Sequence, residues 1–99
     1  MAWVYILCCA DGSYYVGSTR GALENRMWQH STGAGSKYTG SRLPVELVFA
    51  EEYPLVTDAY VREKQLQGWS RKKREALIAD NYARLPQLSK KDFSRRRGE

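Results

Sequence analysis

The chain has 99 residues, of which 42% are hydrophobic and 12% aromatic, so it is long enough for one small domain with a modest core. No apolar run is long enough to span a membrane, and no cleavable signal pattern is present. The two cysteines, Cys8 and Cys9, are adjacent and unsuited to a disulfide. Together these features lead us to expect a cytoplasmic protein. The net charge is +5, and residues 71–99 hold ten Lys or Arg against four Asp or Glu. This excess predicts a polyanionic partner, with nucleic acid the default.

The first nineteen residues predict a β-hairpin. Residues 3–9 are β-branched and aromatic, Asp11-Gly12 is a strong turn signal, and the strand resumes at residues 14–16. Because both faces of the first strand are apolar, we expect it to be a central strand that is buried on both sides.

The length of the hairpin loop decides which side chains share a face. A two-residue loop would pair positions that sum to 23 and place Tyr5 and Tyr15 on opposite faces. A three-residue loop, residues 10–12 with the glycine in the left-handed region, pairs positions that sum to 22. Tyr5 then lies opposite Gly17 and shares a face with Tyr15, and the glycine leaves room beside the phenol. We favour the three-residue loop.

Apolar periodicity predicts a helix that contains residues 23–30 and ends near Gly33. A polar, basic Gly/Ser loop follows as far as Arg42, of the kind that contacts phosphate backbones. Residues 45–53 then predict a third strand, which completes a three-stranded antiparallel sheet.

Two further helices are expected at residues 59–68, capped by Thr57 or Asp58, and from Arg71 to about residue 82. These elements predict an α+β fold, a three-stranded antiparallel β-sheet flanked by about three α-helices, in a domain that ends at residue 82. Residues 83–99 have the composition of a basic, disordered tail.

Arg26 and His30 are four residues apart and therefore neighbours on one helix face, at the border of its apolar stripe. One interpretation is that both side chains extend along the edge of the core. The other is chemical: arginine offers a fixed positive fork to a phosphodiester transition state, and histidine can bind an oxygen or transfer a proton.

Glu63 shares a helix face with Ala59 and Leu66, which places a carboxylate on the apolar side of the second predicted helix. It would either form an ion pair with Arg62, Lys64 or a more distant arginine, or bind a hard divalent cation. Mg²⁺ commonly binds through one or two carboxylates together with substrate phosphate and water, so one glutamate can suffice.

Basic side chains in the loops and in the first turn of the third predicted helix are candidates for contact with a nucleic-acid backbone or for ordinary solvated positions. They are Arg20, Lys37, Arg42, Arg71, Lys72 and Lys73.

The chain resembles the GIY-YIG endonuclease domain. Tyr5 stands in the first of that family's two short motifs, where Trp3 and Val4 replace the glycine and isoleucine, and Tyr15-Val16-Gly17 stands in the second. The order also matches, because Arg26 and His30 follow on the next helix and Glu63 on a later one. Within the family, the chain is similar to small stand-alone bacterial members that are uncharacterised.

The resemblance implies a role for each matching residue. Tyr5 would help to deprotonate the attacking water, with Tyr15 nearby, Arg26 and His30 would stabilise the phosphate, and Glu63 would hold a single Mg²⁺ or Mn²⁺ ion. A tyrosine with a pKa near 10 is a poor base at neutral pH, so a nearby cation must favour its phenolate or relay its proton.

The resemblance therefore implies an Mg²⁺-dependent endonuclease that hydrolyses DNA phosphodiester bonds with weak sequence specificity, in DNA repair or processing. Its substrate would be DNA, including branched or nicked forms. Two alternatives stay open: a non-catalytic nucleic-acid-binding module, and a nuclease subunit that requires a protein partner.

Overall fold

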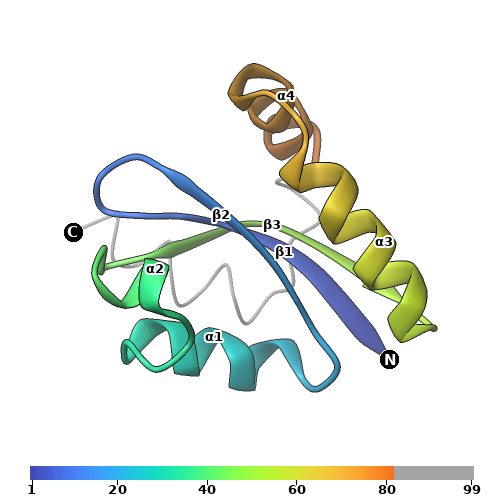
Figure 1. Cartoon of the computed structure of the whole chain (residues 1–99), viewed down its shortest axis with the longest axis horizontal. Coiled ribbons are helices and arrows are strands. Elements are labelled where there is room, and N and C mark those ends of the chain that lie inside the picture. Colours follow the sequence, from blue (N-terminus) through green and yellow to red (C-terminus); the bar gives the residue numbers. More distant parts are fainter. Residues whose placement is uncertain (82–99) are drawn as a thin grey trace.

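The computed structural model describes residues 1–81. Strands β1 (Ala2–Cys8), β2 (Tyr14–Thr19) and β3 (Glu46–Tyr53) form an antiparallel sheet in the order β2-β1-β3. Helices α1 (Leu23–Ser31) and α2 (Lys37–Gly40) lie on one side of it, and α3 (Val56–Gln67) and α4 (Arg71–Asn81) on the other (Figure 1). The predicted α+β fold with β1 as its central strand is confirmed, whereas the predicted tail, 83–99, lies outside the described residues.

The hairpin has the three-residue loop. Tyr5 pairs with Gly17, and every other pair of β1 and β2 likewise sums to 22. Gly12 has a φ of +86°, and its N–H donates to the carbonyl of Cys9 at 2.9 Å. A left-handed residue at the end of the loop is what this hairpin type requires, and glycine adopts that conformation without steric cost.

The two faces of β1 belong to two separate apolar layers. Tyr5 and Leu7 pack in the layer that contains α1, whereas Val4 and Ile6 pack in the layer that contains α3. All four side chains are fully buried. Because each large apolar side chain contributes about 1.5–3 kcal/mol when fully buried, β1 is the strand on which both layers depend.

The third strand contains a β-bulge, which explains why its hydrophobic alternation is only partial. Phe49 pairs with Ile6 and Leu47 with Leu7, so Val48 has no partner in the ladder. Beyond a bulge of this kind, the alternation of side chains between the two faces of the sheet is shifted by one residue. Residues 47–50 are therefore all buried.

The connections differ from the expectation in two places. The segment predicted as a loop contains the short helix α2, which raises the number of helices within residues 1–81 to four. Its cap is Ser36, whose Oγ accepts the N–H of Thr39 at 3.1 Å. Helix α3 begins at Val56 with no side-chain cap, so the prediction that Thr57 or Asp58 caps it is wrong. Within residues 1–81, no helix has both the length and the apolar composition that a membrane span needs.

Candidate active site

The hydroxyl of Tyr5 is the centre of a hydrogen-bonded network at the middle of β1. It lies 2.8 Å from Nε2 of His30, and Nε of Arg26 donates to it at 3.2 Å. Arg26 and His30 both come from α1, one turn apart. The structure therefore brings together three residues that the sequence predicted as one site.

His30 lies behind the phenol and is held there by the segment that contains α2. Its Nδ1 is 2.9 Å from Oγ1 of the buried Thr39, and a Cβ on Gly35 would overlap the imidazole ring. The exposed fraction of His30 is 0%. Direct contact between His30 and a phosphate, as the family resemblance implied, does not fit this position; the ring instead orients Tyr5.

Gly17 lies directly beneath the ring of Tyr5. A Cβ on Gly17 would be 2.7 Å from the Tyr5 hydroxyl oxygen and 3.0 Å from Cε2 of Tyr15. The space that the glycine leaves is thus filled by the Tyr5 ring itself, which extends across the edge strand β2. The absence of a side chain at position 17 determines where the phenol points.

Burial keeps both Tyr5 and His30 uncharged at neutral pH. Burial raises the pKa of Tyr5 to about 12, although the hydrogen bond and the charge of Arg26 act in the opposite direction. Burial, and to a smaller extent Arg26, lowers the pKa of His30 to about 4. The phenolate expected beside a cation is therefore not the resting form, because loss of solvation outweighs the arginine.

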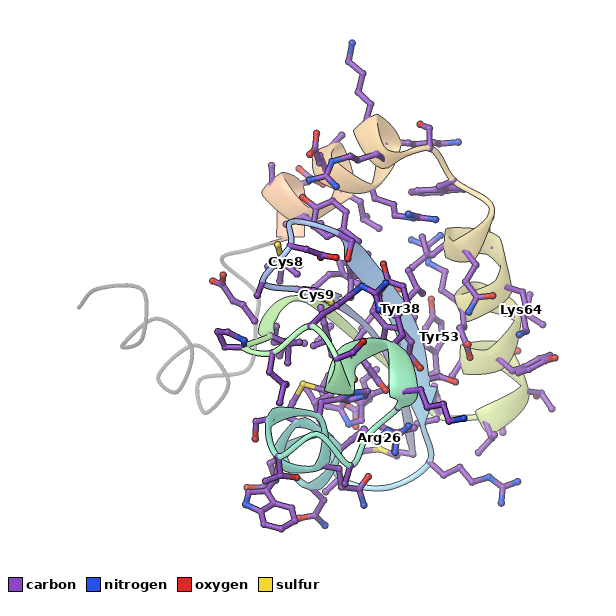
Figure 2. All side chains as sticks on the ribbon, turned by 60° about the vertical axis from the view of Figure 1, so that its left-hand side comes forward. Cys8, Cys9, Arg26, Tyr38, Tyr53 and Lys64 are labelled. Carbon is purple, nitrogen blue, oxygen red and sulfur yellow. The ribbon has the colours of Figure 1, made fainter. Side chains whose placement is uncertain are left out.

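The guanidinium of Arg26 is fixed on three sides. Besides Tyr5, it donates to Oε1 of Gln29 at 2.8 Å and to the carbonyl of Gly35 at 3.1 Å. All three acceptors are uncharged at neutral pH, and none of the ion pairs within residues 1–81 includes Arg26. Figure 2 shows Arg26 beside α2, with α3 and Lys64 on the far side of the sheet. Arg26 thus keeps its positive charge for an anion.

Glu63 approaches β2 from the other face of the sheet. Oγ of Ser18 donates to Oε1 of Glu63 at 2.6 Å, and Nε2 of Gln67 donates to Oε2 at 2.9 Å. The expected alternative, an ion pair with Arg62, Lys64 or a more distant arginine, is not formed within residues 1–81. Arg62 instead pairs with Glu51 at 3.0 Å. Ser18 is adjacent on β2 to Gly17, against which the Tyr5 ring lies, so Glu63 contacts the strand one residue from the Tyr5 network.

The surroundings of Glu63 fit a weakly held hard cation. A carboxylate offers about four acceptor positions, and the two hydrogen bonds to Glu63 leave the others open. Residues 1–81 contain no cluster of three or more His, Cys, Asp or Glu side chains arranged for a metal. The donor set thus matches an ion bound through one carboxylate, with substrate and water as the other ligands.

Tyr15 connects the network to α2. Its ring centre is 5.4 Å from that of His30, and it stacks on Tyr38 at 5.9 Å. On the same ring of Tyr38, the guanidinium carbon of Arg42 lies 3.8 Å from the centre, and Nε of Arg42 pairs with Asp11 at 3.0 Å. Arg42, predicted as a phosphate contact, is therefore already engaged in an ion pair.

Two of the other predicted phosphate contacts, Arg71 and Arg20, lie at opposite ends of β2. Arg71 bonds to Glu75 at 3.0 Å and to the carbonyl of Gly12, in the hairpin loop that precedes β2. Arg20 follows the end of β2 and lines a pocket together with Arg26. Lys37 and Lys72 are exposed, and Lys73 lies over Trp69. Of this set, the structure places Arg20 next to the Tyr5 network.

Four polar contributors to the site were not predicted: Ser18, Gly35, Thr39 and Gln67. The sequence carries weak signals for two of them. Gln67 follows Glu63 by four residues, which places both on one helix face, and Thr39 follows Ser36 with the spacing of an N-cap pair. Neither signal identifies a partner on another element.

Comparison with known proteins agrees with this geometry. Residues 1–76 match the family described as the GIY-YIG catalytic domain. A UPF0213 protein of Natronomonas pharaonis is 44% identical over 78 residues, which cover 79% of this chain and 91% of that protein. A UPF0213 protein of Bacillus pumilus is 40% identical over 78 residues, 79% of each chain.

A solved structure is also similar. The solution NMR structure of a UPF0213 protein from Bacillus halodurans has a TM-score of 0.56 and 35% identity, over 91% of this chain and 96% of that one. The extent of the family match and the identity to these relatives lead to one conclusion: the chain belongs to the GIY-YIG family, where it is similar to the UPF0213 proteins.

Proposed function

We propose that the protein is a metal-dependent endonuclease that hydrolyses DNA phosphodiester bonds. One observation carries the proposal: a buried tyrosine hydroxyl is bonded to Arg26 and His30, and on the neighbouring strand Ser18 holds Glu63, a carboxylate with no cationic partner among residues 1–81. Membership of a family described as a catalytic domain supports hydrolysis. The UPF0213 name of the relatives states no activity.

In the proposed reaction Tyr5 relays a proton. Its hydroxyl takes a proton from the attacking water while it passes its own proton to Nε2 of His30, 2.8 Å away. The water oxygen forms the new bond to phosphorus as the bond to the leaving oxygen breaks. Both groups start neutral, so Tyr5 has a proton to pass on and Nε2 of His30 has a lone pair to receive it, although the lowered pKa of His30 opposes the transfer.

The remaining charges act on the phosphate. Arg26 places a fixed positive charge beside the Tyr5 hydroxyl, where negative charge develops on the phosphoryl oxygens. Glu63 would hold Mg²⁺ or Mn²⁺, and Ser18 and Gln67 would orient its carboxylate. When bound, the ion supplies further positive charge for the phosphate and for the leaving oxygen.

Weak sequence specificity follows from size. A domain of about 80 residues has little surface for direct contact with base edges, and its basic residues favour contact with the DNA backbone. We therefore propose DNA in general as the substrate, including branched or nicked forms, with protein partners supplying any further selectivity.

Cleavage of supercoiled plasmid and of branched or nicked DNA in Mg²⁺ tests the proposal. Wild type would be compared with Glu63→Gln, with an EDTA control, and with Glu52→Gln, which removes an exposed carboxylate on the opposite edge strand. We expect wild type and Glu52→Gln to cleave, and Glu63→Gln and the EDTA sample not to.

Two outcomes would contradict the proposal. Cleavage that survives Glu63→Gln would show that the activity does not arise at this site. DNA binding without cleavage by any variant, unchanged by Glu63→Gln, would favour the non-catalytic binding module.

A further inference from the structure

A pocket of about 540 Å³ opens between the end of β2 and the first turns of α3. This volume is within the range of about 300–1,000 Å³ that is typical of small-ligand sites. Its lining is apolar on the α3 side, where Val56, Ala59 and Tyr60 lie, and cationic on the other, where Arg20 and Arg26 lie.

Two of the three apolar residues of the wall face solvent. The side chain of Tyr60 is 55% exposed and that of Val56 is 39% exposed. Nζ of Lys64 lies 4.9 Å from the centre of the Tyr60 ring. An exposed aromatic ring next to cationic groups is the combination with which proteins stack a nucleobase and neutralise its phosphate.

The pocket is continuous with both halves of the proposed active site. Arg26 lines it and also donates to the Tyr5 hydroxyl. Ser18 lines it and also holds Glu63 at 2.6 Å. A phosphate placed between Arg26 and Glu63 would therefore have its own sugar and base at the mouth of this pocket.

We propose that this pocket binds the nucleoside next to the scissile phosphate, with the base against Tyr60 and Val56 and the following phosphate at Arg20. The inference rests on the proposed nuclease function, which places the scissile phosphate at Arg26. It assigns a ligand to the part of the pocket beyond Arg26 and Ser18, which the proposed cleavage step does not use. It also gives a role to Arg20, which is exposed and forms no ion pair within residues 1–81.

The test measures binding in EDTA, where the proposed cleavage cannot occur. Short DNA oligonucleotides carry the fluorescent base 2-aminopurine at successive positions, and stacking on an aromatic ring quenches its emission. The proteins are wild type, Tyr60→Ala, Tyr60→Phe and Val56→Ser, with Trp28→Ala as the control because it removes an exposed aromatic ring on α1, outside the pocket. Thermal unfolding verifies that each variant is folded.

We expect quenching at one position only, and binding about tenfold weaker for Tyr60→Ala, in the lower half of the range for base stacking on an aromatic ring. Tyr60→Phe and Trp28→Ala should bind like wild type, and Val56→Ser should weaken both the quenching and the binding. Unchanged affinity and unchanged quenching for both Tyr60→Ala and Val56→Ser would overturn the inference.

Cleavage of the same oligonucleotides in Mg²⁺ separates this inference from the proposed function. If the quenched base adjoins the cleaved bond, both are supported. Position-specific quenching by a protein that never cleaves would support the nucleoside pocket and contradict the proposed nuclease function. Cleavage with no effect of Tyr60→Ala or Val56→Ser on binding would keep the nuclease and refute the pocket.

Discussion

Replacing Gly17 with alanine should abolish most of the cleavage while the protein stays folded. The new Cβ would lie 2.7 Å from the Tyr5 hydroxyl oxygen, whereas ordinary van der Waals contact begins at about 3.4 Å, so the phenol has to retreat by about 0.7 Å. Its 2.8 Å hydrogen bond to His30 would then be lost or bent. A displacement of about 1 Å at a reacting group can cost on the order of 100-fold in rate, so we expect cleavage to slow by about 10- to 100-fold.

The cost to stability should be smaller than the cost to activity. Adding a methyl group to a packed site costs about 1–3 kcal/mol, and alanine recovers about 0.4–1 kcal/mol by restricting the unfolded chain. The matched control is Gly68→Ala, outside the pocket, where a Cβ would make only ordinary contact, 3.5 Å from the carbonyl oxygen of Gln65. It should leave cleavage unchanged and should not lower thermal stability.

The assay is the initial rate of plasmid cleavage, together with thermal unfolding followed by circular dichroism. Wild-type cleavage by Gly17→Ala would refute the reasoning, because it would show that the position of the phenol over Gly17 does not matter. If Gly17→Ala failed to fold, Tyr5→Phe would test the same hydroxyl, because it keeps the ring that covers Gly17 and removes only the oxygen.

Three further predictions follow from the same contacts. Thr39→Val removes the hydroxyl that bonds to Nδ1 of His30 and should slow cleavage about tenfold or more, whereas Thr39→Ser should retain most of the wild-type rate. Equal rates for Thr39→Val and wild type would show that the imidazole does not need this hydrogen bond. Ser18→Ala removes the donor to Glu63 and should raise the Mg²⁺ concentration needed for half-maximal cleavage by about tenfold, and an unchanged requirement would separate Glu63 from the metal. The pKa of His30 is near 6.5 in the unfolded chain and about 4 in the fold, so its contribution to stability is present above pH 6.5 and is lost as the pH falls toward 4. Urea denaturation should show a loss of up to about 3 kcal/mol over this range. His30→Gln should flatten this pH dependence, and an equally steep loss in that variant would assign the dependence to other groups.

The hairpin was predictable because its signals are local. Asp11-Gly12 and the need for a left-handed residue select the loop, and the loop selects the register that places Tyr5 over Gly17. The spacing of Arg26 and His30 likewise places both on the inner face of α1. Those predictions needed only neighbours along the chain.

Other features depend on contacts between distant residues, which no local pattern shows. The periodicity of α1 could place His30 on the inner face, but its complete burial depends on Gly35 and Thr39, across a short helix. That helix, α2, is only four residues long and follows a glycine-rich stretch, so its propensity signal is weak. The start of α3 was missed because Leu55 caps it through the backbone alone.

The hairpin loop also determines, from a distance, how the proposed site is assembled. Gly17 and Ser18 are adjacent on β2, and their side-chain positions point to opposite faces, one toward Tyr5 and the other toward Glu63. A change of one residue in the length of the loop at positions 10–12 would exchange the two faces. The Ser18 hydroxyl would then lie under the phenol of Tyr5, and the carboxylate of Glu63 would lose its hydrogen-bond donor. Every residue of the site would still be present. Strand register is thus itself a requirement of the proposed site, and an insertion or deletion of one residue in the loop at positions 10–12 is expected to dismantle the site without changing any of its residues.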